Sequence, residues 1–126
     1  MQFIDQMNRI IRLKFKPKRI VSLVPSQTEL LFELGLKKEV VGITKFCVHP
    51  ESWFRKKTRV GGTKNVNFEE INRLNPDLII ANKEENTESE IKQLMGKYPV
   101  WISNIKNLED ALEMVLLIGE ITQTTK

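Results

Sequence analysis

The sequence is poor in cysteine and histidine: Cys47 is the only cysteine and His49 the only histidine among 126 residues. A single cysteine excludes an intramolecular disulfide, and a structural zinc site needs four ligands, which these residues do not supply. No partner stands at a recognisable spacing to complete a cysteine–histidine nucleophile. We therefore expect no catalytic residue and no metal site formed by the protein alone. Cys47 is expected at a rim or packing position, and His49 can supply one ligand to a metal that a chelate already holds.

The chain also lacks long apolar runs and the common cofactor signatures. No segment approaches the roughly 18 to 20 apolar residues of a membrane span. Residues 1–15 lack the charged start and continuous apolar stretch of a secretory signal. Neither G-x-G-x-x-G, G-x-x-x-x-G-K-[ST] nor G-x-S-x-G occurs. We expect a chain that does not span a membrane and carries no cofactor.

Charge is spread along the sequence rather than concentrated in it. The net charge is +4, and small basic clusters lie at 14–19 and 55–59. Neither cluster has the series of aromatic residues on which a single-strand nucleic-acid binder stacks bases. We interpret both clusters as solvated surface and expect no nucleic-acid partner.

About 40% of the residues are hydrophobic, which is enough for a core, and their arrangement predicts an α/β fold. Residues 1–18 form an expected β-hairpin around the polar turn 5–8, and strands then alternate with helices. This alternation predicts a Rossmann-like, mostly parallel four-stranded sheet flanked by helices. The expected strands are 20–24, 40–43, 78–81 and 100–102, and the expected helices are 27–34, 68–74, 87–97 and one from 108 onward, with 44–67 irregular.

Local signals mark where these helices begin. Ser26 with Glu29, and Thr87 with Glu90, have the spacing of a capping box. Asn67 and Asn107 are expected N-caps for the helices that follow them, and Gly35 is expected to close the helix that begins near Ser26.

The loops that follow the four strands are the expected place for function, because ligands bind at the carboxyl edge of open α/β sheets. The turn at 61–65 is expected to reach the same edge, and its glycines permit close backbone approach. Lys45, Lys64 and Lys83 add positive charge there. The four loops are 25–28, 44–50, 81–86 and 103–107.

The segment 108–121, LEDALEMVLLIGEI, is apolar over more than one narrow stripe of a helix. We expect other elements to pack against such a helix on several sides. We interpret residues 108–126 as the start of a longer helix or as a helix on which another body packs. The alternative is a terminal helix that frays at Thr122.

Four stretches together resemble one family: RIVSLVPSQTELLFELGL, VVGITKFCVHP, RVGGTKNVNFEEINRLNPDLIIAN and VWISNIKNLEDAL. Residues 19 to about 122 resemble the N-terminal lobe of the periplasmic binding proteins that feed ABC importers of vitamin B12, haem and ferric siderophores, and are most similar to the cobalamin-binding subgroup. The resemblance implies a receptor of two lobes joined by one long helix, with a corrinoid, haem or ferric chelate held between the lobes and delivered to a membrane permease. It divides the chain into a hairpin (1–18), a binding lobe (19–107) and the start of the linker helix (108–126), with the second lobe absent.

Together, the expected rim and the resemblance define a candidate ligand site and a docking residue. Glu69 falls where family members carry an acidic residue that pairs with permease arginines. Thr63 and Asn82 stand where the cobalamin binders carry tryptophans, so a polar rim with lysines fits an anionic ferric chelate at least as well as a corrinoid. The expected ligand-binding residues are Ser26, Gln27, Phe46, Cys47, His49, Gly62, Thr63, Lys64 and Asn82.

Two other readings stay open at the level of sequence. One is a cytosolic α/β enzyme or nucleotide-responsive regulator of similar topology, because a fold alone does not define a function. The other is a truncated, inactive product. The resemblance implies a periplasmic or cell-envelope location, while the lack of a recognisable export signal leaves a cytoplasmic one open.

Overall fold

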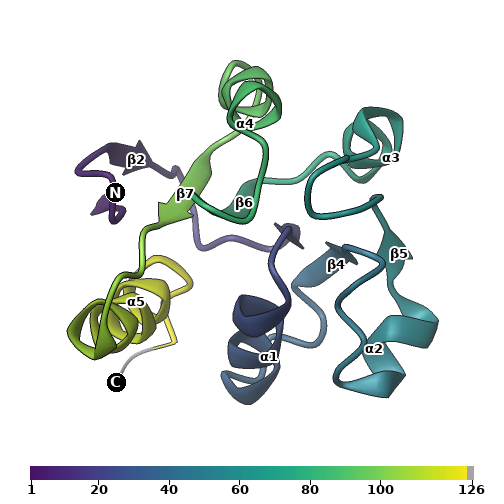
Figure 1. Ribbon diagram of the computed structural model, residues 1–126, viewed down its shortest axis with the longest axis horizontal. Helices are drawn as coiled ribbons and strands as arrows, with labels where there is room; N and C mark the ends of the chain where they lie inside the picture. Colours follow the sequence, from purple (N-terminus) through teal and green to yellow (C-terminus); the bar gives the residue numbers. More distant parts are fainter. Residues whose placement is uncertain (125–126) are drawn as a thin grey trace.

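The computed structural model describes residues 1–124 and shows a parallel sheet between two layers of helices, with a separate hairpin beside it (Figure 1). The sheet has five strands in the order β5-β4-β3-β6-β7, and all its pairings are parallel. Its strands are β3 (Ile20–Ser22), β4 (Val40–Ile43), β5 (Thr58–Arg59), β6 (Leu78–Asn82) and β7 (Val100–Ser103).

Helices cover both faces of this sheet. The helices are α1 (Pro25–Glu33), α2 (Glu51–Lys56), α3 (Phe68–Leu74), α4 (Glu88–Met95) and α5 (Leu108–Ile121). Figure 1 shows α1, α2 and α5 on one face and α3 and α4 on the other. The expected α/β class with its parallel sheet is therefore confirmed.

Two elements lie in the segment that the sequence predicts to be irregular. The sheet has five strands rather than four, because the two residues of β5 pair with Gly42 and Ile43 of β4. The preceding helix, α2, has six residues and buries only Trp53. Both elements are too short to produce a hydrophobic period, and tertiary contacts hold them in place.

Alternation along the strands divides the core in two. Ile20 and Ile80 face the α1, α2 and α5 side, whereas Val21 and Ile79 face α3 and α4. The same parity places Ser22, Asn82 and Ser103, at the carboxyl ends of three strands, on the side of α1. Three neighbouring strands thus end in buried polar side chains on one face.

The hairpin of β1 (Gln2–Ile4) and β2 (Ile10–Arg12) is antiparallel, as the sequence predicts, and it covers the outer edge of β7. The Gln6 amide donates to the carbonyl of Ile102 (3.0 Å), and the buried Asp5 carboxylate accepts from the Ile102 amide (3.2 Å). Asp5 also pairs with Arg9 at 2.7 Å. These bonds satisfy part of a strand edge that would otherwise be free for pairing with another chain.

The predicted helix signals have mixed outcomes. Asn67 and Asn107 are N-caps, accepting from the amides of Glu70 and Asp110. Gly35 closes α1 with a φ of 77°.

The two capping boxes are wrong. Helix α1 begins at Pro25, and its N-cap is Val24, which has no side chain able to cap. Thr87 is the N-cap of α4, but its hydroxyl donates to the carbonyl of Lys64 (2.8 Å), and the Glu90 carboxylate accepts from Val66 (3.2 Å). The neighbouring turn offers partners that outcompete the local ones.

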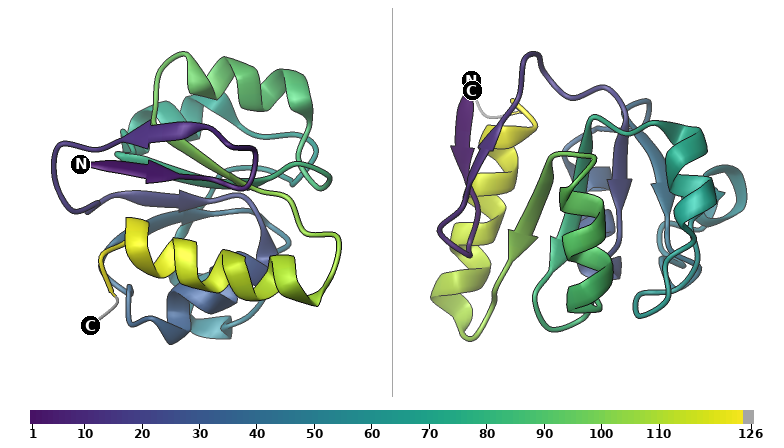
Figure 2. Two further views of the ribbon diagram at one scale, coloured as in Figure 1. Left: turned by 90° about the vertical axis from the view of Figure 1, so that its left-hand side faces the viewer. Right: turned by 90° about the horizontal axis from the view of Figure 1, so that it is seen from above.

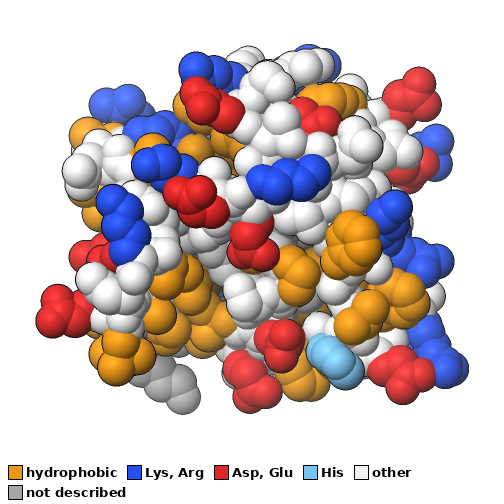
Figure 3. Space-filling model, in the orientation of Figure 1, with side chains coloured by type: hydrophobic (Ala, Val, Ile, Leu, Met, Phe, Trp, Pro, Cys, Tyr) orange, Lys and Arg blue, Asp and Glu red, His pale blue; other side chains and the backbone are white. Residues whose placement is uncertain are grey.

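One side of α5 packs on the sheet and the hairpin, and the other side is exposed to solvent. Met114, Ile118 and Ile121 are buried. The exposed apolar residues of this helix are Leu108, Leu112, Val115 and Leu116. Figure 3 shows hydrophobic side chains gathered over α5, at the lower left. The helix ends at Ile121 with Thr122 as its C-cap, and residues 125–126 of the predicted linker segment lie outside the described residues.

Candidate functional site

The parallel topology brings the loops that follow the strands to one edge of the sheet. Figure 2 (right) shows the strands pointing toward this edge, with the connection from β2 to β3 at the opposite edge. Helices run back from it, so their amino-terminal turns also lie there. We call this edge, formed by residues 24–28, 44–50, 60–67, 82–87 and 103–107, the carboxyl rim.

A buried polar layer supports the rim from below. The Ser103 hydroxyl accepts hydrogen bonds from the side-chain amides of Gln27 and Asn82, the latter at 2.9 Å, and donates to the carbonyl of Ala81 (3.3 Å). Gln27 and Ser103 are fully buried. The Gln27 Oε1 atom has no hydrogen-bond partner among the residues that the structure describes. This layer links α1 with β6 and β7.

Asn86 joins three parts of the rim. Its Oδ1 accepts a hydrogen bond from the backbone amide of Asn82 (2.8 Å), and its Nδ2 donates to the backbone carbonyls of Thr63 (2.9 Å) and Leu23 (3.2 Å). Asn82 in turn accepts from the amides of Glu84 and Glu85 through Oδ1, at 2.8 and 2.9 Å. The loop after β6 is thereby fixed to the end of β3 and to the 61–66 turn.

The 61–66 turn is tied to the loop after β6 by further bonds. The Lys64 ammonium group donates to the carbonyl of Glu84, and the carbonyl of Lys64 accepts from the Thr87 hydroxyl. Within the turn, the Gly62 amide donates to the carbonyl of Asn65 (2.9 Å). That amide is therefore already bonded inside the protein.

The segment after β4 separates its side chains by burial. Cys47 is fully buried, with its sulfur 3.1 Å from the Thr28 hydroxyl and 3.2 Å from the Thr44 hydroxyl. Phe46 is 54% exposed, and His49 is exposed as well. Figure 3, which looks onto the rim, shows the histidine beside hydrophobic side chains. This part of the rim offers an apolar surface with one imidazole.

The structure thus gathers the predicted ligand-binding residues in one region but not on one surface. Ser26, Phe46, His49 and Lys64 are exposed, and Thr63 is half-buried. Gln27 and Cys47 are buried beneath the rim, and Asn82 is 6% exposed. The sequence analysis did not identify the residues that hold the rim together, which are Thr28, Thr44, Asn86 and Ser103. For Thr44 and Ser103 the signal is a polar residue at the end of a strand, and for Asn86 it is a spacing of four from Asn82. Thr28 lies within α1 and has no such signal.

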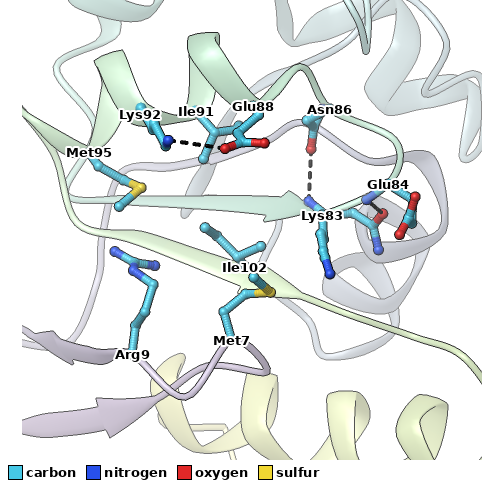
Figure 4. A pocket seen from close by; sticks show the side chains of 11 residues that line it. Met7, Arg9, Lys83, Glu84, Asn86, Glu88, Ile91, Lys92, Met95 and Ile102 are labelled. Carbon is cyan, nitrogen blue, oxygen red and sulfur yellow. Dashed lines mark hydrogen bonds and ion pairs between the residues drawn. The ribbon is translucent and has the colours of Figure 1, made fainter.

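A hollow of about 460 Å³ lies beside the rim, between α4 and the turn of the hairpin (Figure 4). Its apolar lining comes from Met7, Ile91, Met95 and Ile102. Of the predicted ligand-binding residues, only Asn82 contributes to it. The charged groups at its mouth include Lys92 and Glu88, which pair at 3.0 Å.

The exposed polar side chains of the rim include those of Ser26, His49 and Lys64. Within residues 1–124, no three His, Cys, Asp or Glu side chains are placed to hold a metal ion. Among the same residues, no helix has the length and apolar character needed to cross a membrane.

The pKa of Lys57 is lowered by burial and, to a smaller extent, by the charge of Lys37, while Glu39 raises it. This lysine lies at the opposite edge of the sheet from the carboxyl rim.

The profile of the family described as "Periplasmic binding protein" matches residues 20–126, and the chain belongs to this family. The family is one of solute-binding transport components rather than of enzymes. The predicted resemblance is therefore confirmed, and the enzyme reading receives no support.

Individual relatives agree with this assignment. The chain is 35% identical over 120 residues to an uncharacterized ABC transporter substrate-binding lipoprotein, YvrC, of Bacillus subtilis, covering 92% of this chain and 38% of the relative. It is 32% identical over 94 residues to a vitamin B12-binding protein of Vibrio vulnificus, covering 74% of this chain and 34% of the relative.

Solved structures show the same fold. The periplasmic vitamin B12 binding protein BtuF of Vibrio cholerae superposes with a TM-score of 0.75 at 28% identity, covering 88% of this chain and 42% of that one. The petrobactin-binding protein YclQ of Bacillus subtilis superposes with a TM-score of 0.84 at 25% identity, covering 98% and 45%. This chain therefore spans less than half the length of these proteins.

Proposed function

We propose that the chain is the N-terminal lobe of the solute-binding component of an ABC importer, and that its carboxyl rim forms one wall of the ligand cleft. The observation that carries the proposal is the family match over residues 20–126 together with the gathering of the loop tips at one edge. The rim is held by buried side-chain bonds, so it is prearranged for a ligand. It contains no nucleophile paired with a base, which suits a site that binds without reacting.

The ligand class we favour is an anionic ferric chelate, with a corrinoid or haem as the alternatives. The similar proteins include a vitamin B12-binding protein and a petrobactin-binding protein, so the comparisons do not decide the ligand class of this chain. Asn82 and Thr63 offer no flat apolar wall, and Lys45 and Lys83 are exposed on the same rim. The exposed ring of Phe46 and the imidazole of His49 lie at the same edge, and His49 can supply a single ligand to the metal of the chelate.

The proposed division of the chain follows the same architecture. Residues 1–18 are the hairpin, 19–107 the ligand-binding lobe and 108–126 the first part of a helix that joins two lobes. The exposed apolar side of α5 supports this division, since a second lobe would cover it. We further propose a periplasmic or cell-envelope location, in line with the lipoprotein relative.

One lobe supplies only half of a cleft, so this chain alone is expected to bind weakly. A good site buries most of its ligand's surface, and half of that contact leaves a dissociation constant of about 1 mM or weaker. Calorimetric titration of the 126-residue chain and of a two-lobe protein containing it, against cobalamin, haem and ferric siderophores, tests this. Nanomolar binding by the 126-residue chain would overturn the half-site proposal.

Glu69 is the proposed contact to the permease. It is exposed in the first turn of α3, and that turn begins at the rim. Glu69→Arg is expected to weaken co-purification with the permease at least tenfold, because it replaces an attraction to arginine by repulsion. Glu33→Arg makes the same change of charge at the opposite end of the lobe and should leave docking intact. Undiminished docking of Glu69→Arg would remove this residue from the interface.

A further inference from the structure

Basic residues are concentrated at one edge of the sheet. The connections that lead into the strands, at the edge opposite the carboxyl rim, contain two acids, Glu39 and Asp77. They contain eight basic residues: Lys14, Lys16, Lys18, Arg19, Lys37, Lys38, Lys57 and Lys97. We call this surface the amino edge.

The carboxyl rim is less strongly basic. It contains four lysines, at positions 45, 64, 83 and 106, and two acids, Glu84 and Glu85. The first helical turns beside it add seven acids and no basic residue: Glu51, Glu69, Glu70, Glu88, Glu90, Glu109 and Asp110. Acids in first turns complement the helix dipoles, which accounts for their placement but not for the lysines of the 14–18 segment.

An exposed phenylalanine lies in the middle of the basic edge. Phe15 is 76% exposed, between Lys14 and Lys16. The segment is anchored on both sides, because the Leu13 amide donates to Met1 (3.0 Å) and the Asp77 carboxylate accepts from the amides of Lys18 and Arg19 at 2.8 and 2.9 Å. The ring is therefore displayed by a fixed loop, which Figure 2 (right) shows crossing the edge at the top.

A hollow of about 360 Å³ opens beside this ring. It is lined by Arg12, Leu13, Lys14, Phe15, Asp77 and Pro99. The only acid in it is Asp77, whose two carboxylate oxygens are already bonded to backbone amides. An anionic group entering the hollow would meet two cations beside an apolar ring.

We propose that the amino edge rests on a membrane surface rich in anionic phospholipid. Phe15 enters the interface between headgroups and acyl chains, and the surrounding lysines meet the headgroup phosphates. One aromatic ring among cations suits a lipid interface better than nucleic acid, which requires a series of stacking rings. Binding of this kind is weak and reversible. In this resting position the carboxyl rim, with Glu69, faces away from the membrane, so the lobe leaves it before docking on the permease. The proposal goes beyond the ligand cleft proposed above because it uses none of its residues.

Vesicle sedimentation of the 126-residue chain tests the proposal. The chain should bind vesicles of phosphatidylcholine mixed with phosphatidylglycerol, should not bind vesicles of phosphatidylcholine alone, and should be released by salt near 0.5 M, at which the screening length falls to about 4 Å. The triple variant Lys14→Gln/Lys16→Gln/Lys18→Gln should lower the partition coefficient at least tenfold, since each cation near such a surface contributes appreciably. The control Lys45→Gln/Lys92→Gln/Lys106→Gln removes the same charge elsewhere and should change it less than about twofold.

Insertion of the ring is tested separately. Phe15→Trp should be quenched by lipids brominated on their acyl chains, while Trp53 and Trp101 are buried and should not respond. Equal loss of binding in the two triple variants, equal binding to both kinds of vesicle, or absence of quenching would overturn the proposal. The proposal would also be overturned if the chain bound duplex DNA more tightly than vesicles and if Phe15→Ser did not change the DNA binding. That result would define a surface that binds polyanions in general.

Discussion

Asn86→Ala is expected to lower the free energy of unfolding by about 3 kcal/mol and the melting temperature by about 10 °C. Asn86 is 3% exposed, and its side chain makes three hydrogen bonds to backbone groups from three segments. Alanine removes all three bonds. The amide of Asn82 and the carbonyls of Leu23 and Thr63 are then left without this partner, and an unsatisfied buried group costs about 1–3 kcal/mol. Thermal and urea denaturation monitored by circular dichroism measure the loss.

A second variant separates lost bonds from lost volume. Asn86→Asp keeps the size of the side chain but places an oxygen where the Nδ2 atom donates to Thr63 and Leu23. A loss similar to that of alanine is expected, because oxygen then faces oxygen. Asn65→Ala is the matched control, since Asn65 is exposed on the same rim, and it should change stability by less than about 0.5 kcal/mol. Equal stability of Asn86→Ala and Asn65→Ala would show that Asn86 does not hold the rim.

The parts of the fold that follow local signals are predictable from the sequence. The strand at 40–43 and the helix after Asn67 have the expected bounds, because an apolar run and an N-cap are both read within a few residues. Helix α2 and strand β5 have no such signal. Trp53, the anchor of α2, packs edge-on against Phe32 with ring centroids 5.5 Å apart and lies under the Lys57 ammonium group at 4.5 Å. Lys57 is the C-cap of α2 itself, but Phe32 comes from α1, so only tertiary structure reveals the packing of the two rings.

The candidate site also has a part that the sequence predicts and a part that it does not. Parallel topology predicts that the loop tips meet, and the bonds between the 61–66 turn and the loop after β6 agree with that prediction. Which side chains face outward depends on strand parity and on competition between partners. Gln27 bonds to Ser103 and lies beneath the rim, and Thr87 donates to Lys64 rather than capping its own helix. A sequence pattern identifies polar residues near a rim but not the partners that draw them inward.

Gly61→Ala is expected to destabilise the protein by about 3 kcal/mol and to disorder the 61–66 turn. Gly61 has a φ of 94°, a conformation that residues with a Cβ rarely adopt. A Cβ at this position would lie 2.6 Å from the carbonyl oxygen of Asn65 and 2.8 Å from the amide nitrogen of Asn67. Both are backbone atoms, so relief requires the turn to open. Opening would break the bond from the Asn67 amide to the carbonyl of Val60 (2.7 Å) and would displace the N-cap of α3.

The adjacent glycine provides the control for this prediction. A Cβ on Gly62 would meet the ring of Phe46 at 3.4 Å and the Lys45 side chain at 3.5 Å, and both are side chains that can move. Gly62→Ala should therefore cost less than about 1 kcal/mol, since it also lowers the entropy of the unfolded chain. Amide hydrogen exchange distinguishes the two variants: Gly61→Ala should lose protection at Gly62 and Asn67, and Gly62→Ala should retain it at Asn67. Equal protection and stability in both variants would show that the rim tolerates a side chain at either glycine, and that the left-handed backbone of Gly61 is not needed to shape this wall of the proposed cleft.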